Sequence, residues 1–183
     1  DRIESPGQFR QIGAAFGQFQ GMLSDFPIER LHDTIPHFHD TEDRLSKLKQ
    51  AVLRDPLGRV KSCQQELDFV MARQADCSVV MQAQREGKLP LRVTHNDTKI
   101  NNVLFHPADN TAMIVIDLDT VMPGLIGHDF GDAIRFAANY VEEDSPEAEK
   151  AGVDLEVFRA FAEGFLSQTA KTLTDMEVET LAL

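Results

Sequence analysis

A short part of the chain holds most of the side chains that are suited to catalysis. His95, Asp97 and Asn102 are spaced two and five residues apart, and Asp117 and Asp119 follow a later apolar run. A loop Asp can accept the proton of a substrate hydroxyl and orient its oxygen. Asn and Asp also supply the hard oxygen ligands that Mg²⁺ prefers. The pattern therefore predicts metal-assisted phosphoryl transfer, a reaction that depends on positioning and charge neutralisation.

Each of these residues has a separate role in the prediction. Asp97 is the predicted base and orienter of the acceptor hydroxyl, and His95 is predicted to organise the loop. Asn102 and Asp117 are the predicted metal ligands, with Asp119 in a supporting role. The alternative is that Asp and Asn occur here only because they favour turns. Agreement between four positions and two flanking strands favours the chemical interpretation.

The elements that must position these residues change character along the chain. Helices are predicted over 9–23, 41–52, 60–79, 129–141 and 154–165. Three of them begin with a residue that can cap a helix, namely Thr41, Asp129 and Asp154.

Between the third and fourth helices the pattern is that of strands. Short strands are predicted over 91–94, 103–105 and 113–116, and the last two form a hairpin through the turn-rich segment 107–110. Asn102 and Asp117 then lie on the two arms of this hairpin. The predicted fold class is α+β, mainly helical with a small catalytic β-hairpin.

Length and composition limit the class of protein. A chain of 183 residues, 42% of them hydrophobic, can bury one good core, so a single domain is predicted. A formal net charge of −12 would repel a phosphate backbone and disfavours nucleic acid as a partner. No apolar run approaches the roughly 20 residues of a membrane helix, and no signal peptide opens the chain. We expect a soluble protein with no membrane partner.

The two cysteines, Cys63 and Cys77, fall on the apolar side of the helical pattern over 60–79. Two cysteines in this setting do not form the disulfide framework of a small secreted domain. We therefore expect reduced thiols in the core and a cytoplasmic protein.

Three histidines and a carboxylate lie close together in the sequence, at His32, His37, His39 and Asp40. Such a cluster can indicate zinc, but no Cys accompanies it, and a tetrahedral site needs converging ligands that a Pro-containing loop does not provide. A structural role is the favoured interpretation.

The stretch Thr94–Phe105, with Asp117 after the next strand, resembles the aminoglycoside phosphotransferase and choline kinase superfamily. The likeness spans most of residues 9 to 165. Three further segments resemble its N-acetylhexosamine 1-kinase branch, namely 31–41, 116–124 and 129–135. The resemblance implies a two-lobed protein-kinase-like fold that uses ATP and Mg²⁺. It also implies phosphorylation of the anomeric hydroxyl of N-acetylglucosamine or N-acetylgalactosamine.

No part of the chain resembles the N-terminal lobe of that family, with its β-sheet and nucleotide-pairing Lys, and the final helices of the family are also missing. The chain begins at Asp1 without Met. We therefore expect residues 1–183 to be a fragment that covers most of the C-terminal lobe. Such a fragment is expected to be inactive alone.

The segment Asp129-Phe130-Gly131 spells the metal motif of protein kinases, but it opens a predicted helix rather than ending a strand. Asp129 is therefore predicted to cap that helix and to steady the catalytic loop, as the resemblance also implies. Arg135 and Phe136, one to two helical turns further on, are predicted to contact the acceptor. Core packing is the alternative for Phe136, because Phe is readily buried.

The acceptor is the least specified part of the prediction. The phosphoryl-transfer residues would serve equally in a kinase for an aminoglycoside, homoserine or choline. Choline is disfavoured because a cation site needs an aromatic cage, and the chain has no Trp and one Tyr. A non-catalytic kinase-like binding module remains a further alternative.

Overall fold

A computed structural model describes residues 5–109, 111–141 and 145–183 of the chain. It divides into two compact units, one made of Asp1–Thr34 and Leu91–Ala182, and one made of Ile35–Pro90 with Leu183. The single-domain prediction stays a prediction, because two compact units can belong to one folding domain. The first unit contains all of the predicted catalytic residues.

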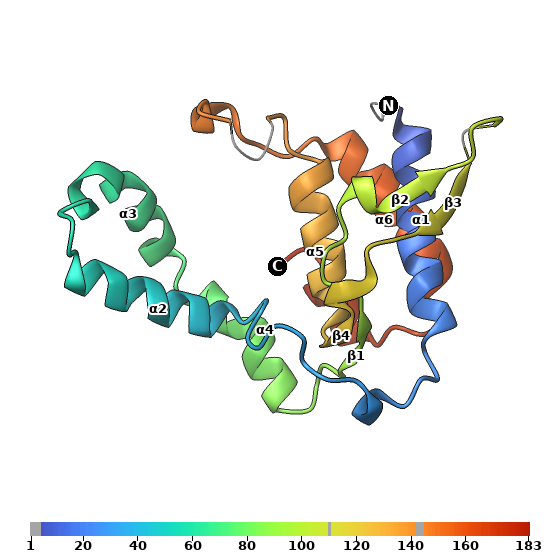
Figure 1. Cartoon of the computed structure of the whole chain (residues 1–183), viewed down its shortest axis with the longest axis horizontal. Coiled ribbons are helices and arrows are strands. Elements are labelled where there is room, and N and C mark those ends of the chain that lie inside the picture. Colours follow the sequence, from blue (N-terminus) through green and yellow to red (C-terminus); the bar gives the residue numbers. More distant parts are fainter. Residues whose placement is uncertain (1–4, 110, 142–144) are drawn as a thin grey trace. The chain divides into compact units, whose positions relative to one another are not determined.

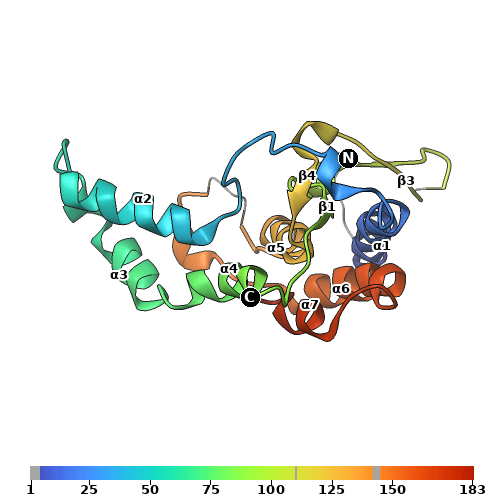
Figure 2. The same cartoon turned by 90° about the horizontal axis from the view of Figure 1, so that it is seen from below.

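Two long helices pack side by side in the first unit (Figure 1 and Figure 2). Helix α1, Pro6–Met22, begins with Ser5 as its cap and Pro6 in its first turn, a favoured arrangement for a helix start. Helix α6, Leu155–Thr169, is capped by Asp154, which accepts the N–H groups of Glu156 and Val157. The helices predicted over 9–23 and 154–165, and the Asp154 cap, are confirmed.

The core of this unit is built from aromatic and aliphatic residues of α1, α6 and the elements next to them. Phe16, Phe161 and Phe165 are at most 1% exposed, and Phe130 makes edge contacts with Phe161 and Phe165. Burial of such side chains supplies the main driving force for folding. The catalytic loop described below rests directly on this core, because His95 packs edge-on against Phe16.

The strands form two antiparallel pairs. Strand β2, Val103–Phe105, pairs with β3, Ala112–Val115, in the predicted hairpin. Strand β1, Arg92–Thr94, pairs with β4, Met122–Gly124, which the sequence did not predict. The predicted α+β class is thus observed, and β1 and β4 frame the loop that begins at His95.

Helix α5, Ile126–Ala137, follows β4, and its start corrects one prediction. Its cap position is Leu125, with no side-chain cap, so Asp129 does not cap the helix. Asp129 lies instead within the first turn, and the helix ends at Ala137 rather than Val141. The carboxylate instead accepts hydrogen bonds from the main-chain N–H groups of His95 and Asn96.

The second unit consists mainly of three helices, α2, Thr41–Arg54, α3, Gln64–Ala72, and α4, Asp76–Arg85. The cap of α2 is Asp40, which accepts the N–H of Asp43, so the prediction of Thr41 as the cap is wrong by one residue.

The long helix predicted over 60–79 is also wrong. A 3-10 helix, η2, Val60–Cys63, precedes α3, and the chain turns between Ala72 and Asp76. The turn allows α4 to pack on α2, where Arg85 forms an ion pair with Glu42. The spacing of apolar residues along one helix does not indicate which other helix it packs against.

The remaining 3-10 helices are short, namely η1, Ile28–Arg30, η3, Ile100–Asn102, η4, Leu118–Thr120, and η5, Ala148–Lys150; a last short helix, α7, spans Asp175–Thr180.

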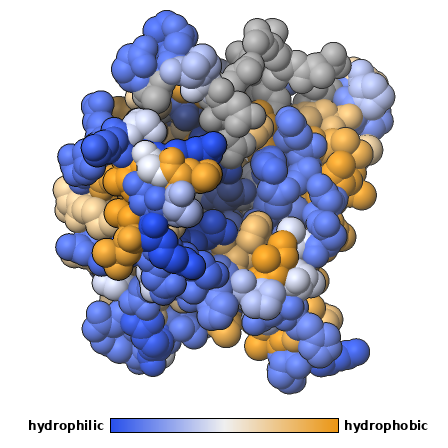
Figure 3. Space-filling view, turned by 60° about the vertical axis from the view of Figure 1, so that its left-hand side comes forward, coloured by the Kyte–Doolittle hydropathy of each residue, from blue (hydrophilic) through white to orange (hydrophobic). Residues whose placement is uncertain are grey.

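Cys63 and Cys77 are free thiols that are half-buried in the second unit, so the prediction that they lie in the core is wrong. Large hydrophobic side chains of this unit, such as Leu53 and Phe69, are exposed. Figure 3 shows hydrophobic residues in separate patches on a mostly hydrophilic face of the chain. In the part of the chain that the structure describes, no helix has the length and apolar character needed to cross a membrane.

Candidate active site

The loop after β1 is held by hydrogen bonds to four successive main-chain amides. The N–H of His95 and that of Asn96 both donate to Asp129, at 3.0 and 2.7 Å. The N–H of Asp97 donates to Nδ1 of His95 at 3.3 Å, and that of Thr98 donates to Asp132 at 2.9 Å. Backbone groups in loops need such partners when they are buried. The loop around Asp97 is therefore fixed by side chains rather than by a sheet or helix.

His95 connects this loop to the end of strand β3. Its Nε2 lies 2.9 Å from the main-chain oxygen of Ile116, which only accepts, so Nε2 carries the proton. Its Nδ1 accepts the N–H of Asp97 and is therefore unprotonated. The imidazole is fully buried and also packs edge-on against Phe16 and Phe19. This geometry supports a loop-organising role for His95.

Asp97 projects from the loop with its carboxylate about a quarter exposed, at 24%. Oδ1 lies 3.1 Å from Nζ of Lys99, and Oδ2 lies 3.3 Å from Nδ2 of Asn102. The same Nδ2 donates to the main-chain oxygen of Asp97 at 2.8 Å. The carboxylate is thus oriented by two neighbours in the loop and remains accessible to a substrate.

Asn102 and Asp117 flank the β2–β3 hairpin, as the sequence predicted. The N–H of Ile116 donates to the main-chain oxygen of Asn102 at 2.9 Å, which extends the pairing of the two strands by one step. The next residue, Asp117, has a left-handed backbone with φ of 65°. Asp is more tolerant of this conformation than most residues, because its short polar side chain can bond locally.

Three hydrogen bonds hold the segment from Ile116 to Thr120 against the catalytic loop. One is the bond from His95 to Ile116. In the second, Oγ1 of Thr120 donates to the main-chain oxygen of His95 at 2.7 Å. In the third, Nδ2 of Asn96 donates to the main-chain oxygen of Thr120 at 3.1 Å. The predicted base and the predicted metal ligands are therefore parts of one connected structure.

The side chains at this place fit a hard divalent cation. Nδ2 of Asn102 is used by Asp97, so its Oδ1 is the atom left for another partner. The carboxylates of Asp117 and Asp119 are exposed, and neither bonds another side chain within the described ranges. One amide oxygen and one or two carboxylates match the small protein contribution of a Mg²⁺ site, in which phosphate and water supply the other ligands.

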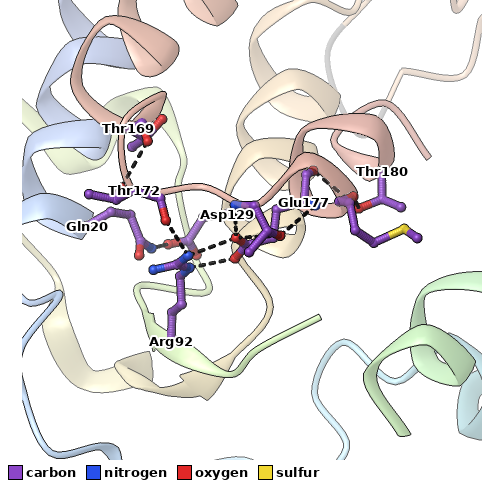
Figure 4. A network of polar contacts seen from close by, with 9 residues as sticks. Gln20, Arg92, Asp129, Thr169, Thr172, Glu177 and Thr180 are labelled. Carbon is purple, nitrogen blue, oxygen red and sulfur yellow. Dashed lines mark hydrogen bonds and ion pairs between the residues drawn. The ribbon is translucent and has the colours of Figure 1, made fainter. Parts of the chain in front are cut away.

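Asp129 is the buried acceptor on which the loop depends, and Figure 4 shows it beside Gln20. It is 1% exposed, and Nε2 of Gln20 donates to its Oδ2 at 2.6 Å, in addition to the two main-chain donors. Burial raises the pKa of this carboxyl, although the hydrogen bonds from His95 and Asn96 oppose the shift. Because this buried carboxylate already accepts three N–H donors, its role is to anchor the loop rather than to bind a metal.

Several residues of this site escaped the sequence analysis. Gln20, Lys99 and Asp132 each contact the loop or Asp129, yet none was predicted to do so. Gln20 left a signal that could have been used, because it is a polar residue on the apolar stripe of helix α1. Asp132 is three residues after Asp129, so the two share a helix face.

The other predicted residues lie outside the loop itself. Arg135 is exposed and pairs with Asp132, and Phe136 is half-buried next to it. In the second unit, His37 lies 3.1 Å from Asp40, which is the cap of α2. Among the residues that the structure describes, no group of three or more His, Cys, Asp or Glu could hold a metal ion.

Residues 2–165 match the model of a protein family that is described as the phosphotransferase enzyme family, APH. The match covers the helices α1 to α5, both strand pairs and the loop with Asp97. It confirms the predicted α+β, protein-kinase-like fold with a helical lobe and a small hairpin.

Proposed function

The chain belongs to the phosphotransferase enzyme family, which indicates small-molecule kinase activity, and we propose that it is the catalytic lobe of a sugar 1-kinase. Kinases of this family generally use ATP and Mg²⁺. The proposed reaction transfers the γ-phosphate of ATP to the anomeric hydroxyl of an N-acetylhexosamine.

One observation carries the proposal. Nδ2 of Asn102 bonds both the main-chain oxygen and the carboxylate of Asp97, while the main-chain oxygen of Asn102 bonds Ile116, which precedes Asp117. A proton acceptor and two oxygen ligands are thereby connected through one residue, Asn102. Phosphoryl transfer needs this combination, because the nucleophile and the metal must be placed relative to the same phosphate.

In the proposed mechanism Asp97 orients the acceptor hydroxyl and takes its proton as the oxygen attacks the γ-phosphorus, and the bond from that phosphorus to the bridging oxygen breaks to release ADP. Asn102 and Asp117 would hold Mg²⁺, with Asp119 in support, and the metal would supply charge neutralisation at the phosphates. Lys99, 3.1 Å from Asp97, adds a positive charge beside the place where the phosphoryl group is transferred. His95 keeps the loop in register with the metal-binding segment.

The acceptor is proposed from the branch-specific likeness of segments 31–41, 116–124 and 129–135 to N-acetylhexosamine 1-kinases. Arg135 ends the last of these segments and Phe136 follows it, and the half-exposed side chain of Arg135 is the proposed donor to a sugar oxygen. We also propose that residues 1–183 form the C-terminal lobe of a two-lobed protein, so that part of the nucleotide site comes from another lobe. The assays below therefore use the two-lobed parent protein.

The test is a coupled assay for ADP formation with a panel of acceptors. The panel contains N-acetylglucosamine, N-acetylgalactosamine, glucose, galactose, kanamycin, homoserine and choline. We expect turnover with the two N-acetylhexosamines and a ³¹P signal of a sugar 1-phosphate in the product. Asp97→Asn should lower kcat by about a hundredfold or more, the scale of a lost general base that also orients its substrate.

Asp109→Asn is the matched control, because Asp109 is an exposed Asp in the turn of the same hairpin. It should leave kcat unchanged. Turnover only with kanamycin, homoserine or choline would replace the sugar acceptor while keeping the kinase. Absence of ADP formation with every acceptor, in a folded wild-type protein, would refute the proposed function.

A further inference from the structure

Asp132 on helix α5 bonds a different partner through each of its oxygens. Oδ2 accepts the main-chain N–H of Thr98 at 2.9 Å and lies 3.4 Å from its Oγ1. Oδ1 accepts a hydrogen bond from Nη2 of Arg135 at 3.0 Å. The side chain of Asp132 is 10% exposed, whereas that of Arg135 is 50% exposed. A nearly buried carboxylate thus joins the catalytic loop to a half-exposed guanidinium.

The bond from Thr98 fixes the peptide unit that follows Asp97. The N–H of Thr98 and the C=O of Asp97 belong to one planar unit, because the C–N bond between them does not rotate freely. Nδ2 of Asn102 donates to that C=O at 2.8 Å. Asp132 therefore holds one edge of the peptide plane and Asn102 holds the other. Rotation of this peptide would break both bonds.

The position of this peptide affects both proposed functions of the loop. It sets the direction in which the Asp97 side chain leaves the backbone. It also fixes the amide of Asn102, whose nitrogen faces the peptide and whose oxygen is left for the metal. The carboxylate of Asp129 holds the two amides before Asp97, and its main-chain oxygen accepts the hydroxyl of Thr98 at 2.6 Å. Without Asp132, the N–H of Thr98 would lose its acceptor, and only the bonds made by the Thr98 hydroxyl and by Asn102 would hold the C-terminal side of Asp97.

We propose that Asp132 is a positioning residue, which sets Asp97 and Asn102 through the Thr98 amide and couples them to Arg135. The inference rests on the proposed function, because it assigns Asp97 and Asn102 their catalytic roles. An acceptor that contacts Arg135 acts on the same carboxylate that holds the peptide. Acceptor binding and placement of the base are therefore linked through one side chain.

Three variants separate the two bonds of Asp132. Asp132→Ala removes both bonds, Asp132→Asn keeps an oxygen for the Thr98 amide but loses the ion pair, and Arg135→Ala removes the ion pair alone. We expect Asp132→Ala to lower kcat by about tenfold or more. Asp132→Asn should recover most of kcat, and both Asp132→Asn and Arg135→Ala should raise the KM for the acceptor.

The double variant Asp132→Ala with Arg135→Ala tests the coupling. If the two residues act as one unit, the second substitution adds nothing to the acceptor KM of the first. Lys150→Ala is the matched control, since Lys150 pairs with Glu147 at the same i,i+3 spacing but on an exposed segment. It should leave both constants at the wild-type values.

Hydrogen exchange gives a readout that does not depend on activity. The amide of Thr98 should exchange faster in Asp132→Ala than in the wild type, and Asp132→Asn should restore its protection. Thermal melts of each variant show whether a loss of kcat merely reflects unfolding. These two measurements hold even if Asp132→Ala is poorly active for other reasons.

Two results would overturn the inference in an active wild-type protein. One is a normal kcat in Asp132→Ala despite a lower Tm, which would make Asp132 a structural brace. The other is an equal loss of kcat in Asp132→Asn and Asp132→Ala, which would assign the effect to charge rather than to the Thr98 bond. A wild-type protein that transfers no phosphate would refute the proposed function instead, and with it the catalytic role of the loop.

Discussion

The carboxylate of Asp129 accepts the main-chain N–H of His95 at 3.0 Å, although 34 residues separate the two positions. Asn96 and Gln20 donate to the same carboxylate. A segment that resembles a metal motif in the sequence is therefore an anchor for the catalytic loop. This relationship distinguishes Asp129 from Asp117, whose carboxylate is exposed.

The first prediction follows from the three donors around Asp129. In Asp129→Asn an amide N–H₂ must face at least one of the N–H donors, so a buried hydrogen bond is lost. The free energy of unfolding should fall by about 1–3 kcal/mol for each donor left unpaired. Asp129→Ala should lose more, because it leaves all three donors without this acceptor. Urea unfolding of both variants checks the order, and equal stability of Asp129→Asn and wild type would contradict it.

The second prediction concerns Asp117 and the metal. Asp117→Asn should greatly weaken Mg²⁺-dependent nucleotide binding in the parent protein, with little change in Tm. Asn tolerates a φ of 65° as well as Asp does, so the substitution removes charge without straining the backbone. Calorimetric titration of ATP with and without Mg²⁺ measures the effect. Asp109→Asn serves again as the control, and a normal Mg²⁺ dependence in Asp117→Asn would remove Asp117 from the metal site.

The third prediction concerns acid stability and the ion pair between Arg92 on β1 and Glu177 on α7 (Figure 4). The guanidinium contacts both oxygens of Glu177, at 2.5 and 2.8 Å, and also donates to the main-chain oxygen of Thr172. Burial opposes ionisation of Glu177, but the hydrogen bonds from Arg92 and Thr174 hold the pKa of its carboxyl below the usual range. The folded state therefore binds this proton less readily than the unfolded chain.

A depressed pKa stabilises the fold above the unfolded value, about pH 4.3 for Glu, and this contribution is lost as the pH falls through the folded value. Breaking a fully buried ion pair lowers the free energy of unfolding by about 3–5 kcal/mol. At pH 7, Glu177→Gln should lower it by somewhat less, because the side chain of Arg92 is 20% exposed. The gap in Tm between wild type and variant should narrow below about pH 4. A gap that is constant from pH 7 to pH 3 would rule out the ion pair as its source.

The fourth prediction tests the close packing of α1 against α6. A Cβ at Gly13 would lie 2.2 Å from the main-chain oxygen of Phe161, and one at Gly164 would lie 1.9 Å from that of Arg10. Backbone atoms inside two packed helices cannot move aside cheaply, so each Gly→Ala change should lower Tm strongly. Gly21→Ala, on α1 but in open space, should instead raise stability by up to about 1 kcal/mol. Similar melting of Gly13→Ala and Gly21→Ala would contradict the packing.

The sequence by itself determined the features that depend on neighbours a few residues apart. Apolar residues at helical spacing predicted α1, two short apolar runs joined by a turn-rich segment predicted the hairpin, and Asp154 was predicted as the cap of α6. The spacing of His95, Asp97 and Asn102 also placed the candidate chemistry on one loop. These predictions succeed because side-chain period and turn preference are local properties of the backbone.

Only the tertiary structure decided which distant groups share a bond. The sequence offered no partner for β1, which pairs with β4, and it predicted that Asp129 steadies the loop while capping a helix, whereas the carboxylate accepts the loop amides and caps no helix. The helix predicted over 60–79 failed for the same reason, since packing of α4 on α2 outweighs the continuity of an apolar stripe. A buried N–H group bonds whichever acceptor the fold brings near it, and the number of residues between two groups in the sequence does not give their distance in space.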